Sequence, residues 1–172
     1  MKQVSLKNLE LYTFILACIM GVIFHYIYNW SGKSFLAGLF FPTNESVWEH
    51  LKLIFLPIML TAVLEYFAGN IQNPCFACIK LRSALLGMVT TIILFYTLSG
   101  IIGKNIAWLN IAIYFIAMAV AYYYSYRSLS AEITASCNPT ACIIIIFAIL
   151  ILFMIFSVYP PNIGLFADPQ MM

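Results

Sequence analysis

The chain has 172 residues, of which 64% are hydrophobic and only 8% are charged. Soluble domains carry about 25% charged residues, so this composition excludes an ordinary soluble protein and indicates an integral membrane protein. The net charge of +2 is small and spread along the chain, which argues against a nucleic-acid partner.

Five apolar stretches account for most of the chain, and each is near the roughly 20 residues that a helix needs to cross a bilayer. They predict spans at residues 9–30, 46–67, 83–102, 106–126 and 142–159. Tryptophan and tyrosine lie near the span ends, where they would serve as interfacial anchors. We therefore expect an all-α fold, an integral membrane helical bundle of five transmembrane helices. It would form a single domain over residues 1–172, with the lipid bilayer as its partner.

The first span carries a histidine near its end. His25 lies five residues before Trp30, which places it about 7 Å inside the membrane face at 1.5 Å per residue. Asn29 shares its helix face. A lone intramembrane histidine is more often a packed, hydrogen-bonded group than a ligand. The expected depth of His25 in the membrane, however, matches that of the polar residues that begin the second span.

The densest polar segment lies at the entrance of the second span and contains Asn44, Glu45, Glu49, His50 and Lys52. At helical spacing Glu45, Glu49 and Lys52 fall on one face and His50 on a neighbouring one. Ser46 and Glu49 also match a capping box, in which both side chains satisfy backbone donors. Capping explains Glu49 but neither His50 nor Lys52, although Lys52 could extend back to the interface.

Charge also falls deep inside the second span. Lys52 and Glu65 are thirteen residues apart, or roughly 20 Å, against a bilayer core of about 30 Å. At least one of them must lie below the membrane surface, where an ionisable group marks a functional site by default. Pro57 lies between them and predicts a kink, with the carbonyl of Leu53 left without its usual donor.

Two cysteine pairs lie in loops at the other end of the bundle, Cys75 with Cys78 and Cys137 with Cys142. The layout resembles that of quinone-linked disulfide enzymes of the DsbB and vitamin K epoxide reductase type, which implies thiol redox chemistry. A tetrathiolate zinc site and plain unpaired thiols are the alternatives in a reducing compartment. We favour plain thiols, because charge places these loops in the cytoplasm and their proline and asparagine flanks suit ordinary loops.

The distribution of positive charge predicts the orientation. The end with the N-terminus carries Lys2, Lys7, Lys80, Arg82 and Arg127, and the opposite end carries Lys33, Lys52 and Lys104. The positive-inside rule therefore predicts a multi-pass plasma-membrane protein whose N-terminus is cytoplasmic and whose C-terminus is outside.

The chain ends in a proline-restrained tail. Pro160 and Pro161 favour an extended backbone, which predicts that the tail folds back as a lid and places Asp168 above His50 and Lys52. A tail that only anchors at the interface is an equal alternative.

Three strings resemble those of an uncharacterised bacterial family of small multi-pass membrane proteins, a domain of unknown function. They are His25-x4-Trp30-Ser31-Gly32, PxNESxWEHLK over residues 42–52 and PPxIxLFxDP over residues 160–169. The resemblance covers the first two spans and the tail, and it implies a shared polar site there. It implies no particular activity, and the cysteine pairs are not part of its pattern.

We expect a polar pocket, with the tail as its cover, lined by His25, Asn29, Asn44, Glu45, Glu49, His50 and Lys52. The first hypothesis is binding or transport of a small polar or cationic ligand, or of a metal held by His25, Glu49 and His50. The alternative is an enzyme acting on a lipid-like substrate, with Glu49 or His50 as general base and Lys52 stabilising negative charge. Thiol redox chemistry and a non-catalytic partner subunit or homo-oligomer are weaker alternatives. The sequence indicates no particular cofactor.

Overall fold

The computed structural model describes residues 5–69, 71–131 and 137–168. Within these residues the chain is all-helical, without strands, and five helices are long and apolar enough to span a membrane. These five are α1 (Leu6–Trp30), α3 (Val47–Ala68), α4 (Phe76–Ile102), α5 (Ala107–Ser130) and α6 (Pro139–Val158). The short helix α2 (Phe35–Phe40) and the 3₁₀ turn η1 (Gly164–Phe166) complete the fold. The predicted all-α bundle of five membrane-length helices is confirmed.

The helix boundaries differ most from the predicted spans at α4 and α5. α4 begins at Phe76 and not at residue 83, so Lys80 lies inside a membrane-length helix and not in a loop. Lys80 and Arg82 lower the local hydropathy, and this is why the predicted span starts too late. α5 continues to Ser130, beyond the predicted end at residue 126.

Side-chain caps fix the start of three helices. The hydroxyls of Ser5 and Ser46 and the amide oxygen of Asn138 accept hydrogen bonds from backbone N–H groups in the first turns of α1, α3 and α6. α4 ends at Gly103, whose φ of 73° is the left-handed conformation that glycine adopts without strain. The turn that follows leads into α5, so that α4 and α5 form a hairpin.

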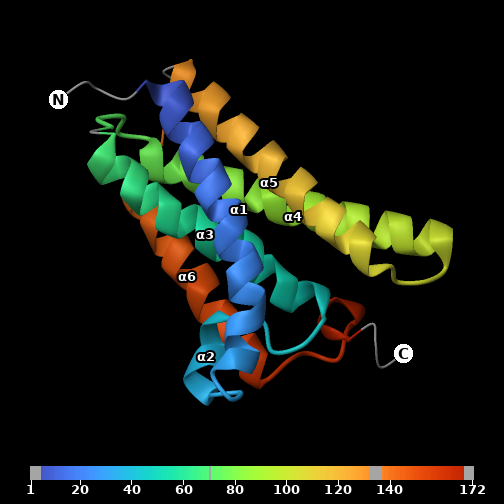
Figure 1. Ribbon diagram of the computed structural model, residues 1–172. Coiled ribbons are helices and arrows are strands. Elements are labelled where there is room, and N and C mark those ends of the chain that lie inside the picture. The colour runs from blue at the N-terminus through green and yellow to red at the C-terminus, as the bar shows by residue number, and fades with distance from the viewer. Residues whose placement is uncertain (1–4, 70, 132–136, 169–172) are drawn as a thin grey trace.

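Small residues bring the helices into close contact at the centre of the bundle. Ala84, Ala117 and Ala121 are fully buried, and a Cβ on Gly87 would come within 2.9 Å of Ile54. Close packing of this kind holds helices together where lipid removes the hydrophobic driving force between them. Figure 1 shows that α4 and α5 run side by side and diverge from α1, α3 and α6 towards their connecting turn.

α1 meets α3 at the carbonyl that Pro57 frees. Pro57 lies inside α3, which continues to Ala68, and it cannot donate to the carbonyl of Leu53. Gly21 of α1 packs there, because a Cβ at this position would lie 3.0 Å from the Leu53 oxygen and would overlap the phenol of Tyr114. The unpartnered carbonyl expected from the sequence is therefore a point of contact between two helices.

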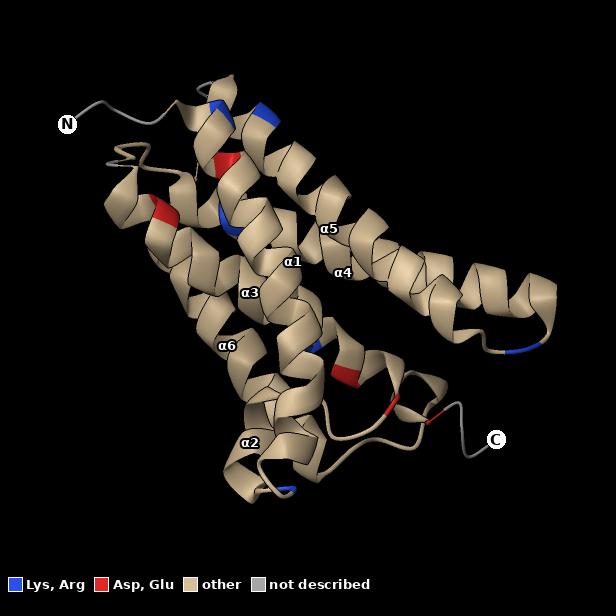
Figure 2. Cartoon of the chain, in the orientation of Figure 1, with Lys and Arg blue, Asp and Glu red and all other residues tan. Residues whose placement is uncertain are grey.

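Several charged side chains are buried inside the bundle, each at most 3% exposed: Glu10, Glu49, Lys52, Glu65 and Lys80. Lys52 and Glu65, of which at least one is expected below the membrane surface, are both buried within the bundle. Figure 2 shows that the charged residues gather towards the ends of the bundle and leave the middle of the helices uncharged. The buried charges form one cluster at each end, and the two clusters differ in how their partners are matched.

Candidate functional site

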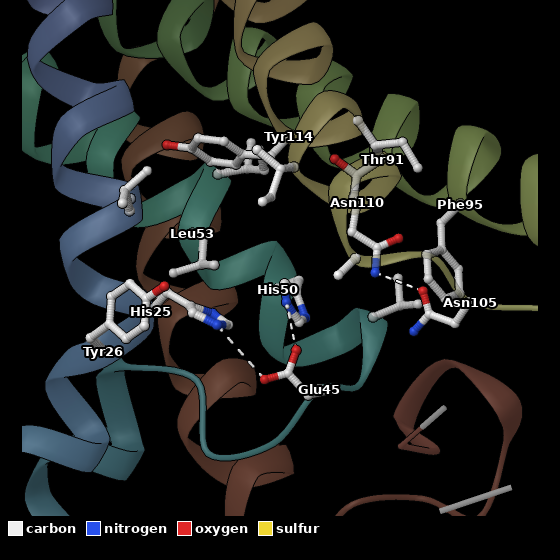
Figure 3. A pocket seen from close by; sticks show the side chains of 17 residues that line it. His25, Tyr26, Glu45, His50, Leu53, Thr91, Phe95, Asn105, Asn110 and Tyr114 are labelled. Carbon is white, nitrogen blue, oxygen red and sulfur yellow. Dashed lines mark hydrogen bonds and ion pairs between the residues drawn. The ribbon is translucent and has the colours of Figure 1, made fainter. Parts of the chain in front are cut away.

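A cavity of about 690 Å³ lies between α1, α3 and the α4–α5 hairpin. Its volume is in the range of small-molecule sites in proteins. Apolar side chains make up most of the wall, among them Val22, Leu53, Ile54, Phe95, Ile111 and Ile113. Figure 3 shows that the labelled polar side chains approach the cavity from two sides. We call this cavity the pocket.

The first polar side consists of His25, Glu45 and His50. One carboxylate oxygen of Glu45 lies 3.7 Å from Nε2 of His25, and the other lies 3.5 Å from Nε2 of His50 (Figure 3). The two imidazole rings are 5.5 Å apart between centroids. Nδ1 of His50 lies 2.9 Å from the carbonyl oxygen of Ser46, which leaves Nε2 directed at Glu45. The three side chains are between 26% and 36% exposed, so a ligand in the pocket could reach them.

The second polar side comes from the α4–α5 hairpin. The amide of Asn110 donates to the side-chain oxygen of Asn105 at 2.8 Å, and Thr91 and Tyr114 lie nearby on the same wall. Tyr114 in turn donates from its phenol to the carbonyls of α1, at 3.1 and 3.2 Å. The sequence-based set contains none of these four residues. The parity of the spans places the Gly103–Lys104 turn at the same end as Glu45, and this signal could have found Asn105 and Asn110.

Glu49 and Lys52 do not line the pocket. Lys52 donates to Glu49 at 2.9 Å, to the carbonyl of Gly38 at 3.2 Å and to the hydroxyl of Ser157 at 2.5 Å. Glu49 also accepts from the backbone N–H of Thr43 at 2.9 Å and from Ser157 at 2.8 Å. These contacts tie α3 to α2, to the segment before α3 and to α6. We call this set of five residues the Glu49–Lys52 cluster.

Several expectations for the entrance of α3 are therefore corrected. Glu45 precedes the helix and faces the pocket, so it does not share the surroundings of Glu49 and Lys52. Only half of the capping box forms, because Ser46 caps the helix whereas the carboxylate of Glu49 turns to Thr43 and Lys52. The carboxylate that meets the histidines is Glu45 and not Glu49. Among the described residues, no three His, Cys, Asp or Glu side chains are arranged to hold a metal ion.

The remaining predicted site residues lie around the pocket and not on its wall. Asn29 is exposed near the end of α1, and Asn44 accepts from the backbone N–H of Ser46 at 2.9 Å. A carboxylate oxygen of Asp168 accepts from the backbone N–H of Glu45 at 3.4 Å, so the tail does reach the entrance of α3.

The tail is held there by aromatic packing. Phe166 in η1 lies 4.8 Å from Trp48 of α3 and 5.4 Å from Phe156 of α6 between ring centroids. A Cβ on Gly164 would come 3.8 Å from the hydroxyl of Tyr96 in α4, so the tail bridges α3 and α4. That Asp168 acts as a lid above His50 and Lys52 stays a prediction, and residues 169–172 lie outside the described part of the chain.

The cysteines form two disulfides, Cys75 with Cys137 and Cys78 with Cys142. The preference for plain unpaired thiols is therefore wrong. It rested on a cytoplasmic location for these loops, and it could not take account of the 5.8 and 5.2 Å that separate the Cα atoms of each pair. Each disulfide joins the start of α4 to the start of α6, because the two cysteines of the CxxC motif pair with different partners.

A family model with the description "Family of unknown function (DUF6512)" matches residues 1–171. No curated protein matches the chain, and no solved structure does.

Proposed function

The chain belongs to this family of unknown function, and we propose that it binds or transports a small polar or cationic ligand in the pocket. The expected membership of an uncharacterised family is confirmed, whereas the bacterial origin stays a prediction. The observation that carries the proposal is the convergence of His25, Glu45 and His50 on one side of an otherwise apolar cavity. The ligand would place a polar or positive group at Glu45 and an apolar part against the walls.

The contacts of Glu45 leave room for such a group. Its oxygens lie 3.5 and 3.7 Å from the imidazoles, which is longer than a well-formed hydrogen bond. A carboxylate only accepts hydrogen bonds, so an amine or hydroxyl of a ligand can replace either contact. The two imidazoles also offer ring nitrogens to a polar group of the ligand on the same side of the pocket.

The competing hypotheses lose support from the surroundings of their residues. The enzyme hypothesis used Glu49 or His50 as general base and Lys52 to stabilise negative charge. His50 lines the pocket, whereas Glu49 and Lys52 are enclosed and occupied by protein partners. Thiol redox chemistry is disfavoured because the CxxC cysteines are not paired with each other, and the cross-links favour a structural role in holding α6 to α4. A partner subunit and a homo-oligomer stay predictions.

Two observations on the orientation disagree. Lys52 and Lys80 are buried in ion pairs, which leaves Lys2, Lys7, Arg82 and Arg127 against Lys33 and Lys104 in the charge comparison. This excess still favours a cytoplasmic N-terminus, although Lys2 lies outside the described residues. Disulfides, in contrast, rarely persist in a reducing cytosol and favour an oxidising compartment at that end.

We infer that the disulfides outweigh so small a charge excess, and that the pocket opens towards the cytoplasm of a plasma-membrane protein. Reporter fusions to the C-terminus in intact cells test this orientation. A cytoplasmic signal supports it. An external signal, together with zinc in the purified protein, would favour the opposite orientation and a tetrathiolate site.

Ligand binding is tested by thermal unfolding in detergent with choline, tetramethylammonium and zinc chloride as probes. We expect an ammonium compound to raise the Tm of the wild type and to have no effect on the Glu45→Gln variant. A rise with zinc alone would instead indicate a metal site. Uptake of the same compound into proteoliposomes separates transport from binding.

Two variants of α5 provide a matched control. Ile111 lines the pocket, whereas Ile116 on the same helix does not, and both are about half exposed. Ile111→Trp should fill the pocket and abolish the shift, and Ile116→Trp should preserve it. Equal shifts in the wild type, Ile111→Trp and Glu45→Gln would overturn the proposal.

A further inference from the structure

A second buried cluster lies at the end of the bundle that carries the disulfides. Nζ of Lys80 in α4 lies 2.8 Å from Oε1 of Glu10 in α1 and forms an ion pair with Oε2 of Glu65 in α3. The hydroxyl of Ser125 in α5 donates to Oε1 of Glu10 at 2.8 Å. Four helices therefore meet at one ammonium and two carboxyl groups. We call these four residues the Glu10–Lys80–Glu65 cluster.

The charges in this cluster do not balance. Two carboxylates and one ammonium would leave one excess negative charge on residues that are at most 3% exposed. An unbalanced buried charge is far costlier than a neutral group, so such sites bind a proton or another cation. Oε2 of Glu10 and Oε1 of Glu65 have no hydrogen-bond partner among the described residues. These two oxygens leave room for the missing positive charge.

The neighbouring polar groups do not supply that charge. The hydroxyl of Thr13 in α1 donates to backbone carbonyls of its own helix. Thr61 in α3 donates to the carbonyl of Pro57 at 2.7 Å, and the hydroxyl of Tyr122 in α5 lies 2.6 Å from the Thr61 oxygen. The proton of Tyr122 is therefore engaged with Thr61. Among the residues described above on α1, α3, α4 and α5, Lys80 is the one positively charged group that faces the two carboxyls.

We propose that the Glu10–Lys80–Glu65 cluster holds one exchangeable proton and that Glu65 carries it. Glu10 receives hydrogen bonds from both Lys80 and Ser125. Glu65 is paired with Lys80 and has the Thr13 hydroxyl beside it, whose proton already goes to a backbone carbonyl. Glu10, which receives two hydrogen bonds, therefore keeps its charge beside Lys80, and the proton neutralises Glu65. The cluster is then a neutral set of one ion pair and one carboxylic acid.

The position of the cluster allows this proton to exchange with water. Glu10 is the fifth residue of α1 and Lys80 the fifth of α4, so each lies about 6 Å from the start of its helix at 1.5 Å per residue. The pocket lies towards the opposite end of α3. The proton site is thus separate from the pocket, and the inference does not depend on the proposed function.

Infrared spectroscopy of the full-length protein in lipid tests the proposal. We expect a carbonyl band of a protonated carboxylic acid at neutral pH, which shifts in D2O and is lost in Glu65→Gln. Glu10→Gln should also abolish the band, because it leaves Glu65 and Lys80 as a balanced pair, and this variant serves if Glu65→Gln does not fold. Glu45→Gln, which changes a carboxylate outside the cluster, should leave the band unchanged.

Three infrared results would contradict an exchangeable proton on Glu65. A wild-type protein without such a band would overturn the proposal, and stabilisation by sodium in that case would assign the site to a metal cation. A band that persists in both Glu65→Gln and Glu10→Gln would place the proton elsewhere. A band that does not shift in D2O would contradict exchange.

Discussion

The two buried clusters have similar ingredients but opposite hydrogen-bond balance. In the Glu49–Lys52 cluster one carboxylate meets one ammonium, and donors from Thr43 and Ser157 occupy its oxygens. In the Glu10–Lys80–Glu65 cluster two carboxyls share one ammonium, and two of their oxygens have no partner among the described residues. The charges and hydrogen bonds of the first cluster are matched within the protein, whereas the second cluster lacks one positive charge.

The comparison teaches that burial of charge does not identify a functional site by itself. A satisfied polar network makes the fold rigid and specific, whereas an unsatisfied buried group calls for a further explanation. The pocket adds a third case, because Glu45 and the two histidines are partly exposed and only loosely paired.

The largest loss of stability is expected for variants of the Glu49–Lys52 cluster. Glu49→Gln leaves the ammonium of Lys52 buried without its counter-ion, and Lys52→Met does the same to Glu49. Each should lower the free energy of unfolding by about 3–5 kcal/mol, as measured by equilibrium unfolding in mixed micelles. Because an apolar replacement of a whole pair is often tolerated, the double variant Glu49→Leu with Lys52→Met should recover much of this loss. Single variants as stable as the wild type would show that the cluster does not hold the fold together.

Loss of a disulfide should come next. Cys75→Ser combined with Cys137→Ser removes one link between the starts of α4 and α6, where α6 buries little beyond Phe153. We expect a loss of about 2 kcal/mol, the lower end of the usual range, since the unfolded helices stay in the membrane. Reduction of the wild type by dithiothreitol should give at least the same loss. An unchanged unfolding curve after reduction would contradict a structural role for the disulfides.

A smaller effect is expected for Glu65→Gln. Glutamine keeps a carbonyl oxygen for Lys80, and the remaining Glu10–Lys80 pair is balanced. The loss should be below about 1 kcal/mol, in contrast to the equivalent change at Glu49. A loss of the same size at Glu65 and Glu49 would show that Glu65 is an ionised partner of Lys80 and not a carboxylic acid.

The smallest effect is expected in the pocket. Glu45 is about one-third exposed, and Glu45→Gln should change stability by less than about 0.5 kcal/mol. The same variant should lose the thermal shift with ammonium compounds, so that binding and stability separate. A large loss of stability would instead make Glu45 part of the structural framework.

The sequence predicted the five helices because long apolar runs have few alternatives in a bilayer. It also placed His25 and His50 at a common depth, and the structure brings their rings within 5.5 Å of each other. The sequence could not separate Glu45 from Glu49, because the partners that decide between them are distant in the chain: Ser157 of α6 binds Glu49, and His25 of α1 faces Glu45.

The second cluster escaped prediction for a different reason. Lys80 was assigned to a loop because a charged residue lowers hydropathy, and only its pairing with Glu10 and Glu65 makes its place inside α4 tolerable. The disulfides escaped because the charge rule pointed to a reducing compartment. In both cases long-range contacts overrode a local rule.

The most direct test of the central claim, that the pocket is a binding site, is a high-resolution map of the protein purified in native-lipid nanodiscs. We expect density inside the cavity, in contact with the carboxylate of Glu45 and bounded by Ile111 and Leu53. A map that resolves these side chains around water alone, with a bound compound at another place in the bundle, would contradict it.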